Sequence, residues 1–399
     1  MQSAARAKVL LFLGVMIFGI GQSMLFVVFG PLAREMGLSP IQFGLIFTLS
    51  NIGLAIASPF WGRKSDSIGR KPIFLVGLAG TAVGLIVLAF AIQVGLWKLL
   101  PIWALVFVLF LARSVYSLTA TAVYPSSAGF MADITDRKNR ARGMALIGGG
   151  NSMGAVFGPA IGALGSIVGF VLFPMYAAAA LAIIGLIVAA TMLAEPTRHE
   201  NTSGAPGMKI TDPRIRPFMY LWIAFFLVFT TLQFITAFYI QDQFGISDPK
   251  DVVWYASLAL FFLGVFNVGI QLGLFQIIHV TPRTLLRMCF PSLALALAIL
   301  AVAQDIWQIF PAYALIGLAF SCANPGINGG ASLSVEPWEQ GATSGLLAAA
   351  TTVGVVFGPL LGTSLYEIGH TLPMIVGAVV AIAMAVYGFT VPVPDPKHE

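Results

Sequence analysis

The chain has 399 residues, of which 58% are hydrophobic and only 9% are charged. So few charged side chains cannot give a soluble globule of this size a hydrated surface, and the composition therefore excludes an ordinary soluble protein. The net charge of +5 would suit a nucleic-acid partner, but the distribution of the charges along the chain indicates membrane topology instead.

Apolar stretches follow one another along the whole chain. A bilayer core about 30 Å thick requires roughly 20 apolar residues per helix, and each stretch has about 20 to 25. The polar and apolar alternation of membrane strands is missing. The sequence predicts an all-α membrane protein with 12 transmembrane helices, which begin near Lys8, Ile41, Pro72, Pro101, Arg142, Gly169, Pro217, Val252, Thr284, Trp307, Ala342 and His370.

The basic residues indicate the orientation in the membrane. If the amino terminus is cytoplasmic, 17 of the 21 Lys and Arg residues fall in cytoplasmic segments, whereas Arg34, Lys98 and Lys250 fall on the far side and Arg113 falls inside a helix. This bias is the positive-inside rule. We therefore predict a multi-pass protein of a bacterial-type inner membrane, with both termini in the cytoplasm.

The chain divides into two similar halves. The longest polar stretch, EPTRHENTSGAPGMKITDPRIRP, begins at Glu195 and separates six helices from six. We predict an amino-terminal bundle over 1–194, a cytoplasmic linker over 195–216 and a carboxy-terminal bundle over 217–399. GAVFGPAIG at 154–162 returns as GVVFGPLLG at 354–362, and Pro125 corresponds to Pro325 at the same spacing. The halves are thus predicted to be pseudo-symmetric duplicates with a substrate site at their interface.

The loop between the second and third helices reads GRKSDSIGRKP, with one acid among several cations. Gly62 and Gly69 were expected to permit a tight turn around Asp66. Together with the glycine motif of helix five, this loop resembles the major facilitator superfamily, and the helix-five motif resembles that of its drug:proton antiporters. The resemblance implies the major facilitator fold, working by alternating access.

The resemblance also implies a cytoplasmic latch, in which Asp66 contacts the start of helix eleven in the other half. The latch residues are Gly62, Asp66, Gly69, Arg70 and Lys71. Ser67 stands where the family usually has Arg, which leaves one ion pair of the latch open. The matching loop of the second half has Ile277 at the position of the acid, so the latch is expected to be one-sided.

Glycines at spacings of four on helices five and eleven favour close helix packing, and proline permits a bend. We expect a structural helix interface rather than substrate contacts, with Gly264, Gly269 and Gly273 of helix eight as the surface facing helix five. The predicted interface residues are Gly150, Gly154, Gly158, Pro159, Gly162, Gly354, Gly358 and Pro359.

Arg113 is the one charge placed deep in a predicted span, where its burial costs at least about 2.5 kcal/mol. It resembles the helix-four arginine of the antiporters, although Tyr116 and Ser117 depart from their R-x-x-Q-G pattern. The alternative is an arginine that only holds helices together. The acids Glu35, Asp133 and Asp242 fall toward helix ends, so a proton carrier is not obvious and neutral or anionic amphiphiles are favoured.

Polar and aromatic residues inside the spans complete the candidate substrate and coupling site. Packing against neighbouring side chains, and hydrogen bonding between helices, are the alternatives for each of them. The candidates are Arg113, Gln22, Asn51, Tyr116, Asn151, Gln233, Phe234, Tyr239, Asn267, Gln271, Asn324 and Asn328.

No enzyme signature or cofactor motif is found. Cys289 and Cys322 read as apolar filler, and GGGN at Gly148 lacks the lysine of a phosphate loop. The four histidines, His199, His279, His370 and His398, are isolated and lack the spacing of metal ligands.

The sequence thus predicts a secondary active transporter, a monomer in the lipid bilayer, which exports small amphipathic compounds, drug-like or metabolite, by proton antiport and needs only the proton gradient. No nucleic-acid partner is expected. The alternative is an importer or uniporter of an organic anion or other metabolite. A sensor or membrane-embedded enzyme would require an added soluble domain or a catalytic cluster.

Overall fold

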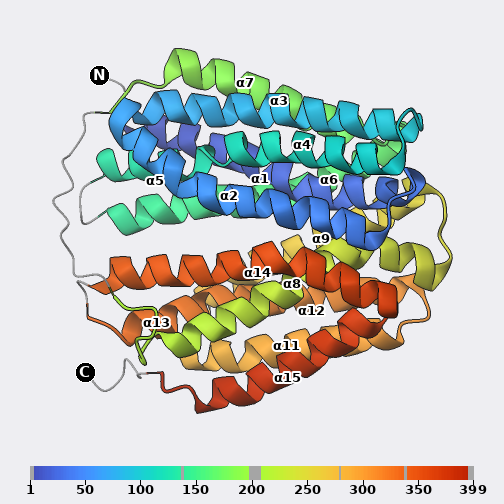
Figure 1. Ribbon diagram of the computed structural model, residues 1–399. Helices are drawn as coiled ribbons and strands as arrows, with labels where there is room; N and C mark the ends of the chain where they lie inside the picture. Colours follow the sequence, from blue (N-terminus) through green and yellow to red (C-terminus); the bar gives the residue numbers. More distant parts are fainter. Residues whose placement is uncertain (1–3, 136–138, 197–207, 278–279, 337–338, 394–399) are drawn as a thin grey trace. The chain divides into compact units, whose positions relative to one another are not determined.

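The computed structural model describes residues 4–135, 139–196, 208–277, 280–336 and 339–393 (Figure 1). Among these residues, 12 helical segments are long and apolar enough to cross a membrane, and the secondary structure is helical throughout. Each span begins within four residues of its predicted start. The predicted all-α architecture with 12 transmembrane helices is confirmed.

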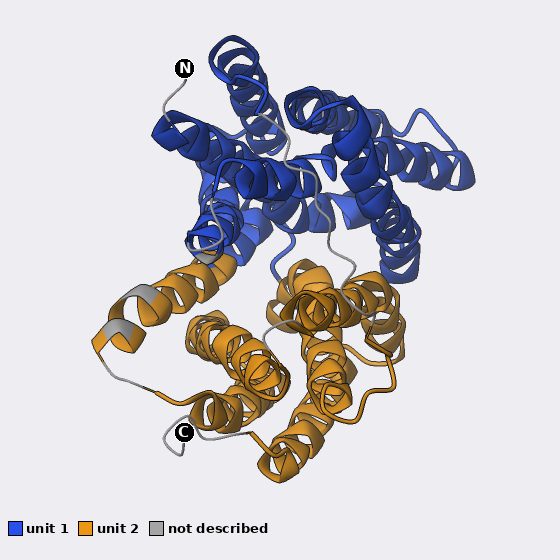
Figure 2. Cartoon of the chain, turned by 90° about the vertical axis from the view of Figure 1, so that its left-hand side faces the viewer, with its two compact units in different colours: residues 1–201, 246–258 blue, residues 202–245, 259–399 orange. Residues whose placement is uncertain are grey.

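The chain forms two compact units, coloured separately in Figure 2: Met1–Asn201 with Ile246–Leu258, and Thr202–Gly245 with Ala259–Glu399. The first part of α9 (Pro249–Gly269) is grouped with unit 1, whereas the predicted carboxy-terminal bundle covers all of 217–399. Unit 1 otherwise contains α1 (Ala4–Glu35), α2 (Pro40–Ile68), α3 (Arg70–Leu96), α4 (Ile102–Ala120), α5 (Val123–Asp133), α6 (Arg140–Val168) and α7 (Phe173–Met192).

Unit 2 follows the same plan with more interruptions in its helices. Its elements are α8 (Arg216–Phe244), the end of α9 (Pro249–Gly269), η1 (Ile270–Leu274), α10 (Phe275–Ile277), α11 (Pro282–Val302), η2 (Ile306–Gln308), α12 (Ile309–Ala323), η3 (Asn324–Asn328), α13 (Gly329–Leu333), α14 (Gln340–Ile368) and α15 (Leu372–Thr390).

Local sequence explains where several helices begin and end. Ser39 caps α2, because its hydroxyl accepts from the backbone N–H of Gln42 while the Gln42 side chain accepts from the N–H of Ser39. This reciprocal pair satisfies two amide groups that a helix start leaves open. At the other end of a helix, Gly169 closes α6 with φ +79°, a left-handed conformation that glycine adopts without steric cost.

Two equivalent prolines interrupt two equivalent spans. The fourth span breaks into α4 and α5 just before Pro125, and the tenth span contains the π-helix η3 at Pro325. Proline has no N–H to donate to the carbonyl four residues earlier, so the regular α-helical pattern fails at both places. The predicted correspondence of Pro125 and Pro325 therefore has a structural counterpart.

The tightest helix pair of each unit is built from the repeated glycine motif. α6 packs most extensively on α1, and α14 on α8. Ser23 Oγ donates to the Gly154 carbonyl at 3.1 Å, and Thr230 Oγ1 donates to the Gly354 carbonyl at 3.0 Å. The two units thus repeat the same hydroxyl-to-carbonyl contact across the same pair of helices.

An ion-pair cluster ties the segment before α8 to the start of α14 in unit 2. Arg214 contacts both carboxylate oxygens of Glu339 at 2.8 Å, and it also pairs with Asp212 at 2.9 Å. Hydrogen bonds from Arg214 hold the pKa of both carboxyl groups below its usual range. The predicted linker is therefore anchored at its carboxyl end by charged contacts.

Candidate functional site

Arg113 lies buried in unit 1, where α1, α2 and α4 meet, with 2% of its surface exposed. Its guanidinium donates to Ser117 Oγ one turn later on α4. It also lies 3.5 Å from Gln22 Oε1 on α1 and 3.5 Å from Asn51 Oδ1 on α2, the long end of the hydrogen-bond range. The structure therefore brings together three residues that the sequence analysis had selected separately.

Two aromatic rings complete the surroundings of this guanidinium. Its central carbon lies 4.9 Å from the ring centre of Phe47 and 5.2 Å from that of Tyr116. A cation held against aromatic faces gains about 0.5 to 2 kcal/mol, depending on its desolvation. Tyr116, a predicted site residue, is fully buried on α4, whereas Phe47 was not predicted.

The hydrogen bonding of this cluster, the Arg113 site, is incomplete. Among the described residues, neither Arg113 Nε nor the Tyr116 hydroxyl has a hydrogen-bond partner. Among the described residues, the guanidinium contacts uncharged amides, a hydroxyl and aromatic rings, and it contacts no carboxylate. Buried donors left open in this way are costly, so the site is suited to a ligand that presents an acceptor oxygen or an anionic group.

A second candidate site is a cavity of about 450 Å³ within unit 2. Its lining is aromatic on α8 and α12 and polar on η3, α13 and α14, and it contains no charged side chain among the described residues. Asn324 and Asn328 were predicted from the sequence, whereas the other lining residues were not. The cavity is lined by Trp222, Phe226, Phe320, Asn324, Asn328, Ser332, Gln340, Thr343, Ser344, Leu347, Ala348 and Thr351.

Hydrogen bonds hold the polar wall of this cavity in place. Trp222 Nε1 donates to Asn328 Oδ1 at 2.9 Å, and Asn328 Nδ2 donates to Asn324 Oδ1 at 2.6 Å. Gln340 similarly links to Ser332, whose hydroxyl donates to Gln340 Oε1 at 2.8 Å. A few fixed polar groups in a mainly apolar cleft can orient an uncharged ring system.

The remaining candidates belong neither to the lining of this cavity nor to the described contacts of the Arg113 guanidinium. On α8, Phe234 and Tyr239 are buried, and the Tyr239 hydroxyl donates to the Leu300 carbonyl at 2.5 Å, which is a packing role. Gln271 donates to Asn267 within α9 and η1 at 2.9 Å. Asn151 on α6 is exposed and Gln233 on α8 is half-buried.

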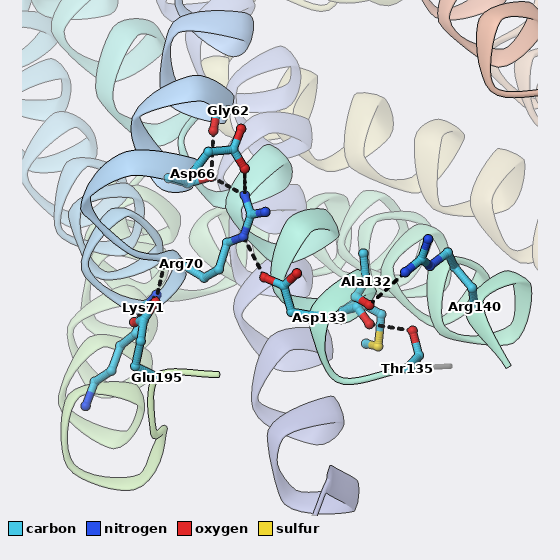
Figure 3. A network of polar contacts seen from close by, with 11 residues as sticks. Gly62, Asp66, Arg70, Lys71, Ala132, Asp133, Thr135, Arg140 and Glu195 are labelled. Carbon is cyan, nitrogen blue, oxygen red and sulfur yellow. Dashed lines mark hydrogen bonds and ion pairs between the residues drawn. The ribbon is translucent and has the colours of Figure 1, made fainter. Parts of the chain in front are cut away.

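The predicted latch motif forms an ion-pair network inside unit 1 (Figure 3). Arg70 lies between two carboxylates, with Nη1 2.5 Å from Asp66 Oδ1 and Nε 2.8 Å from Asp133 Oδ2. The Asp133 side chain is 4% exposed, whereas that of Asp66 is 61% exposed. Asp133 was not predicted for this network, because only the fold brings the end of α5 to the start of α3.

Glu195, beyond α7, holds the start of α3 in the same network. Its two carboxylate oxygens accept from the backbone N–H groups of Arg70 and Lys71 at 2.6 and 2.9 Å. An anion at a helix amino terminus completes open amide groups and is favoured by the helix dipole. The Lys71 side chain donates to the Ala190 carbonyl at 2.8 Å and adds a second tie to α7.

The turn of the latch motif differs from the prediction at Gly62. Gly62 and Asp66 both lie within α2, which continues to Ile68, so Gly62 is not part of a turn. A Cβ at Gly62 would make only an ordinary contact with Pro125. Gly69 does make the turn, since its φ of +136° disfavours any residue with a side chain.

The expected partner is wrong for three of the helix-five glycines. A Cβ at Gly150, Gly154 or Gly158 would collide with α1 of the same unit. Gly269 and Gly273 have nothing within 4 Å of such a Cβ. Pro159 lies inside α6, and Gly162 faces both Val27 of α1 and Ser257 of α9, the eighth span, so the predicted partner is met at this one position of the motif. In unit 2, Gly354 and Gly358 meet α8 in the same way, with Pro359 buried on α14.

The cysteines form neither a disulfide nor a metal site among the described residues. Cys289 and Cys322 are buried free thiols. The described residues contain no group of three or more His, Cys, Asp or Glu able to hold a metal ion. His199, His279 and His398 lie outside the described residues, as do the basic residues Arg137, Lys138, Arg198 and Lys397.

Comparisons with known proteins point in one direction. The family model described as Major Facilitator Superfamily matches residues 11–301 and 278–399. The chain is 24% identical over 390 residues to Multidrug resistance protein 2 of Bacillus subtilis (strain 168), covering 94% of this chain and 92% of that protein. It is 23% identical over 396 residues to Quinolone resistance protein NorA of Staphylococcus aureus (strain COL), covering 97% and 96%.

Solved structures show the same fold. The crystal structure of the nucleoside transporter NupG matches with a TM-score of 0.70 and 14% identity, covering 98% of each chain. At this identity the likeness concerns the arrangement of the helices and not the ligand.

Proposed function

We propose that this chain, which belongs to the Major Facilitator Superfamily, exports small amphipathic compounds from the cell in exchange for protons. It is a multi-pass membrane transporter, and its relatives include proteins named for multidrug and quinolone resistance. In this proposal both termini face the cytoplasm of a bacterial cell, and the transporter works as a monomer that alternates between inward and outward access.

The proposed substrate class rests on one observation: Arg113 is buried, and its Nε has no hydrogen-bond partner among the described residues. A buried guanidinium among uncharged partners leaves a net positive site in a low-dielectric environment. Such a site attracts anions and acceptor groups and repels lipophilic cations. The preferred substrates are therefore neutral or anionic amphiphiles, with their apolar part held by rings beside Arg113 such as Phe47.

The experiment is flux through purified protein in liposomes, with neutral, anionic and cationic fluorescent amphiphiles supplied under an imposed pH gradient. Arg113→Ala should reduce flux of the preferred compound about tenfold or more, since one charge-assisted contact is worth about 1.5 to 3 kcal/mol. Arg113→Lys should keep part of it. Normal flux in both variants, or a preference for cations in the wild type, would refute the proposed substrate class.

One observation favours the alternative of an importer or uniporter. In the described spans, the buried charged side chains are Arg113 and Asp133, and Asp133 is engaged with Arg70. A carboxylate that could carry a proton through the middle of the membrane is therefore not present among these residues. Flux that is unaffected by the pH gradient would favour this alternative over antiport.

A further inference from the structure

A carboxylate, a phenol and an imidazole meet where α8 and α14 end in unit 2. The Tyr366 hydroxyl donates to Asp242 Oδ2 at 2.7 Å, and His370 Nε2 lies 3.7 Å from the same oxygen. The rings of Tyr366 and His370 stack with centroids 5.1 Å apart and planes 17° apart. Tyr366 is buried, whereas the side chains of Asp242 and His370 are 17% and 56% exposed. Water therefore reaches the imidazole beside a carboxylate that the buried phenol holds in place.

We propose that Asp242, Tyr366 and His370, the Asp242 cluster, form a proton-binding site through which the pH outside the cell acts on transport. The inference rests on the proposed function in one respect: cytoplasmic termini place the carboxyl ends of α8 and α14 on the outer face, where protons enter in an antiport cycle. The geometry of the cluster itself is independent of that orientation.

The imidazole is the group that takes up the proton. Histidine is the side chain that ordinarily changes its charge near neutral pH. Nε2 accepts a proton from a hydronium ion, which leaves as water, and the new N–H faces Asp242 Oδ2. An imidazolium at this place faces the Asp242 carboxylate and stacks on the Tyr366 ring. The charge of the cluster changes from −1 to 0, and the contact between a carboxylate and an uncharged imidazole becomes an ion pair.

The charged groups around the cluster leave His370 as its pH-dependent cation. Glu367 lies beside it on α14, and Asp305 follows α11, where its carboxylate accepts from the Trp307 N–H at 3.0 Å. Asp248, Lys250 and Asp251 follow α8 in the segment that belongs to unit 1. The basic residues in the described part of unit 2 lie before or within the first turns of their helices, at the opposite end: Lys209, Arg214, Arg216, Arg283 and Arg287.

The internal repeat shows that helix packing does not require this cluster. Ser23 bonds to Gly154 in unit 1 as Thr230 bonds to Gly354 in unit 2, which aligns α1 with α8 and α6 with α14. Residues 23 and 230 are 207 apart, and residues 154 and 354 are 200 apart.

With these spacings, the positions of Asp242, Tyr366 and His370 correspond to those of Glu35, Ser166 and Phe170 in unit 1. Glu35 is exposed, and the Ser166 hydroxyl donates within its own helix to the Ala163 carbonyl at 2.7 Å. The two units thus share the helix pair and the glycine contacts, but the imidazole and phenol occur in unit 2 alone. Glu35 supplies a matched control for Asp242.

The test is the unfolding temperature of the purified full chain in detergent, measured from about pH 5.5 to about pH 8. The ion pair is present when His370 is protonated, so the wild type should exceed His370→Gln by about 1 to 3 °C at the acid end. The difference should disappear as pH rises past neutral. It should also disappear at every pH when both proteins carry Asp242→Asn, whereas Glu35→Gln should leave it intact.

A second measurement separates this inference from the proposed function. Uptake and release of a fluorescent fluoroquinolone are followed in liposomes under opposite pH gradients. His370→Gln should remove most of the stimulation by outside acid, whereas Glu35→Gln should not. An unfolding temperature of His370→Gln that follows the wild type at every pH overturns the Asp242 cluster. Wild-type flux that ignores the pH gradient overturns both proton antiport and the action of outside pH on transport, whereas proton binding by the Asp242 cluster is decided by the unfolding temperatures alone.

Discussion

At the scale of single residues, the Arg113 site is fully buried but not fully bonded. The Tyr116 hydroxyl has no partner among the described residues, although water cannot reach it. An unmade hydrogen bond of this kind costs about 1 to 3 kcal/mol. Tyr116→Phe should therefore unfold at the same or a higher temperature than the wild type, with a gain of up to about 1 kcal/mol.

The same substitution should reduce transport several-fold if the hydroxyl completes its bonding with substrate. Unfolding temperature and liposome flux are measured on the same preparation. Ser117→Ala is the control, since it removes a hydroxyl that does have a partner, Arg113, and should lower stability. A clear loss of stability in Tyr116→Phe would show that the hydroxyl is bonded in the resting protein.

Single residues also show how far sequence reasoning reaches. Arg113 was predictable because a lone charge in an apolar span is rare and costly, and Gln22 and Asn51 because amides are uncommon there. Trp222 and Phe320 were not, since aromatic residues fill lipid-facing positions equally well. His370 was set aside as isolated, because its nearness to Asp242 depends on how α8 and α14 pack. A signal was available in the repeat, where Phe170 stands in its place.

At the scale of helices, the repeated glycines divide into packed and open positions. A Cβ at Gly154 would collide with the backbone of α1, at Met16 and Gly19. Backbone cannot move aside as a flexible side chain can, so Gly154→Ala should cost about 1 to 3 kcal/mol. Gly149 lies on the same helix with nothing within 4 Å of such a Cβ. Gly149→Ala should stabilise by about 0.5 to 1 kcal/mol.

Unfolding temperatures of these two variants, in one detergent, check the assignment of the glycine motif to packing within unit 1. Equal effects of the two substitutions would contradict it. The sequence predicted the close packing from the spacing of the glycines, but it chose helix eight as the partner of the whole motif, whereas α1 meets Gly150, Gly154 and Gly158 and helix eight meets Gly162. The spacing of the glycines shows that one face of the helix consists of small residues that allow close packing. It does not show which helix packs there, because that depends on the tertiary structure.

At the scale of the whole molecule, hydropathy and the ungapped repeat were enough to predict 12 spans and two similar halves, because the bilayer leaves few alternatives to helices. The network around Arg70 was only half predictable. Asp66 and Arg70 are four residues apart on the chain, whereas Asp133 and Glu195 reach Arg70 and its neighbour from α5 and from beyond α7. Contacts between distant segments carry no local signature.

This network separates a structural carboxylate from one proposed to act in the transport cycle. Asp133 is nearly buried against Arg70, so Asp133→Asn should destabilise the protein by about 1 to 3 kcal/mol. Asp66 pairs with the same Arg70 but is mostly exposed, so Asp66→Asn should cost less than about 1 kcal/mol. The carboxylate of Asp66 therefore contributes little to the stability of the fold, and a role in transport would explain it better.

If Asp66 latches the cytoplasmic side during alternating access, Asp66→Asn should slow turnover several-fold while the protein remains folded and still binds ligand. Turnover is measured in liposomes, binding by ligand-induced thermal shift, and folding by the unfolding temperature without ligand. Arg63→Gln, a change in the same helix outside the network, controls for loss of charge. Normal turnover in Asp66→Asn would contradict the proposed latch. Turnover that falls only as much as the amount of folded protein falls would show that Asp66, like Asp133, acts by stabilising the fold.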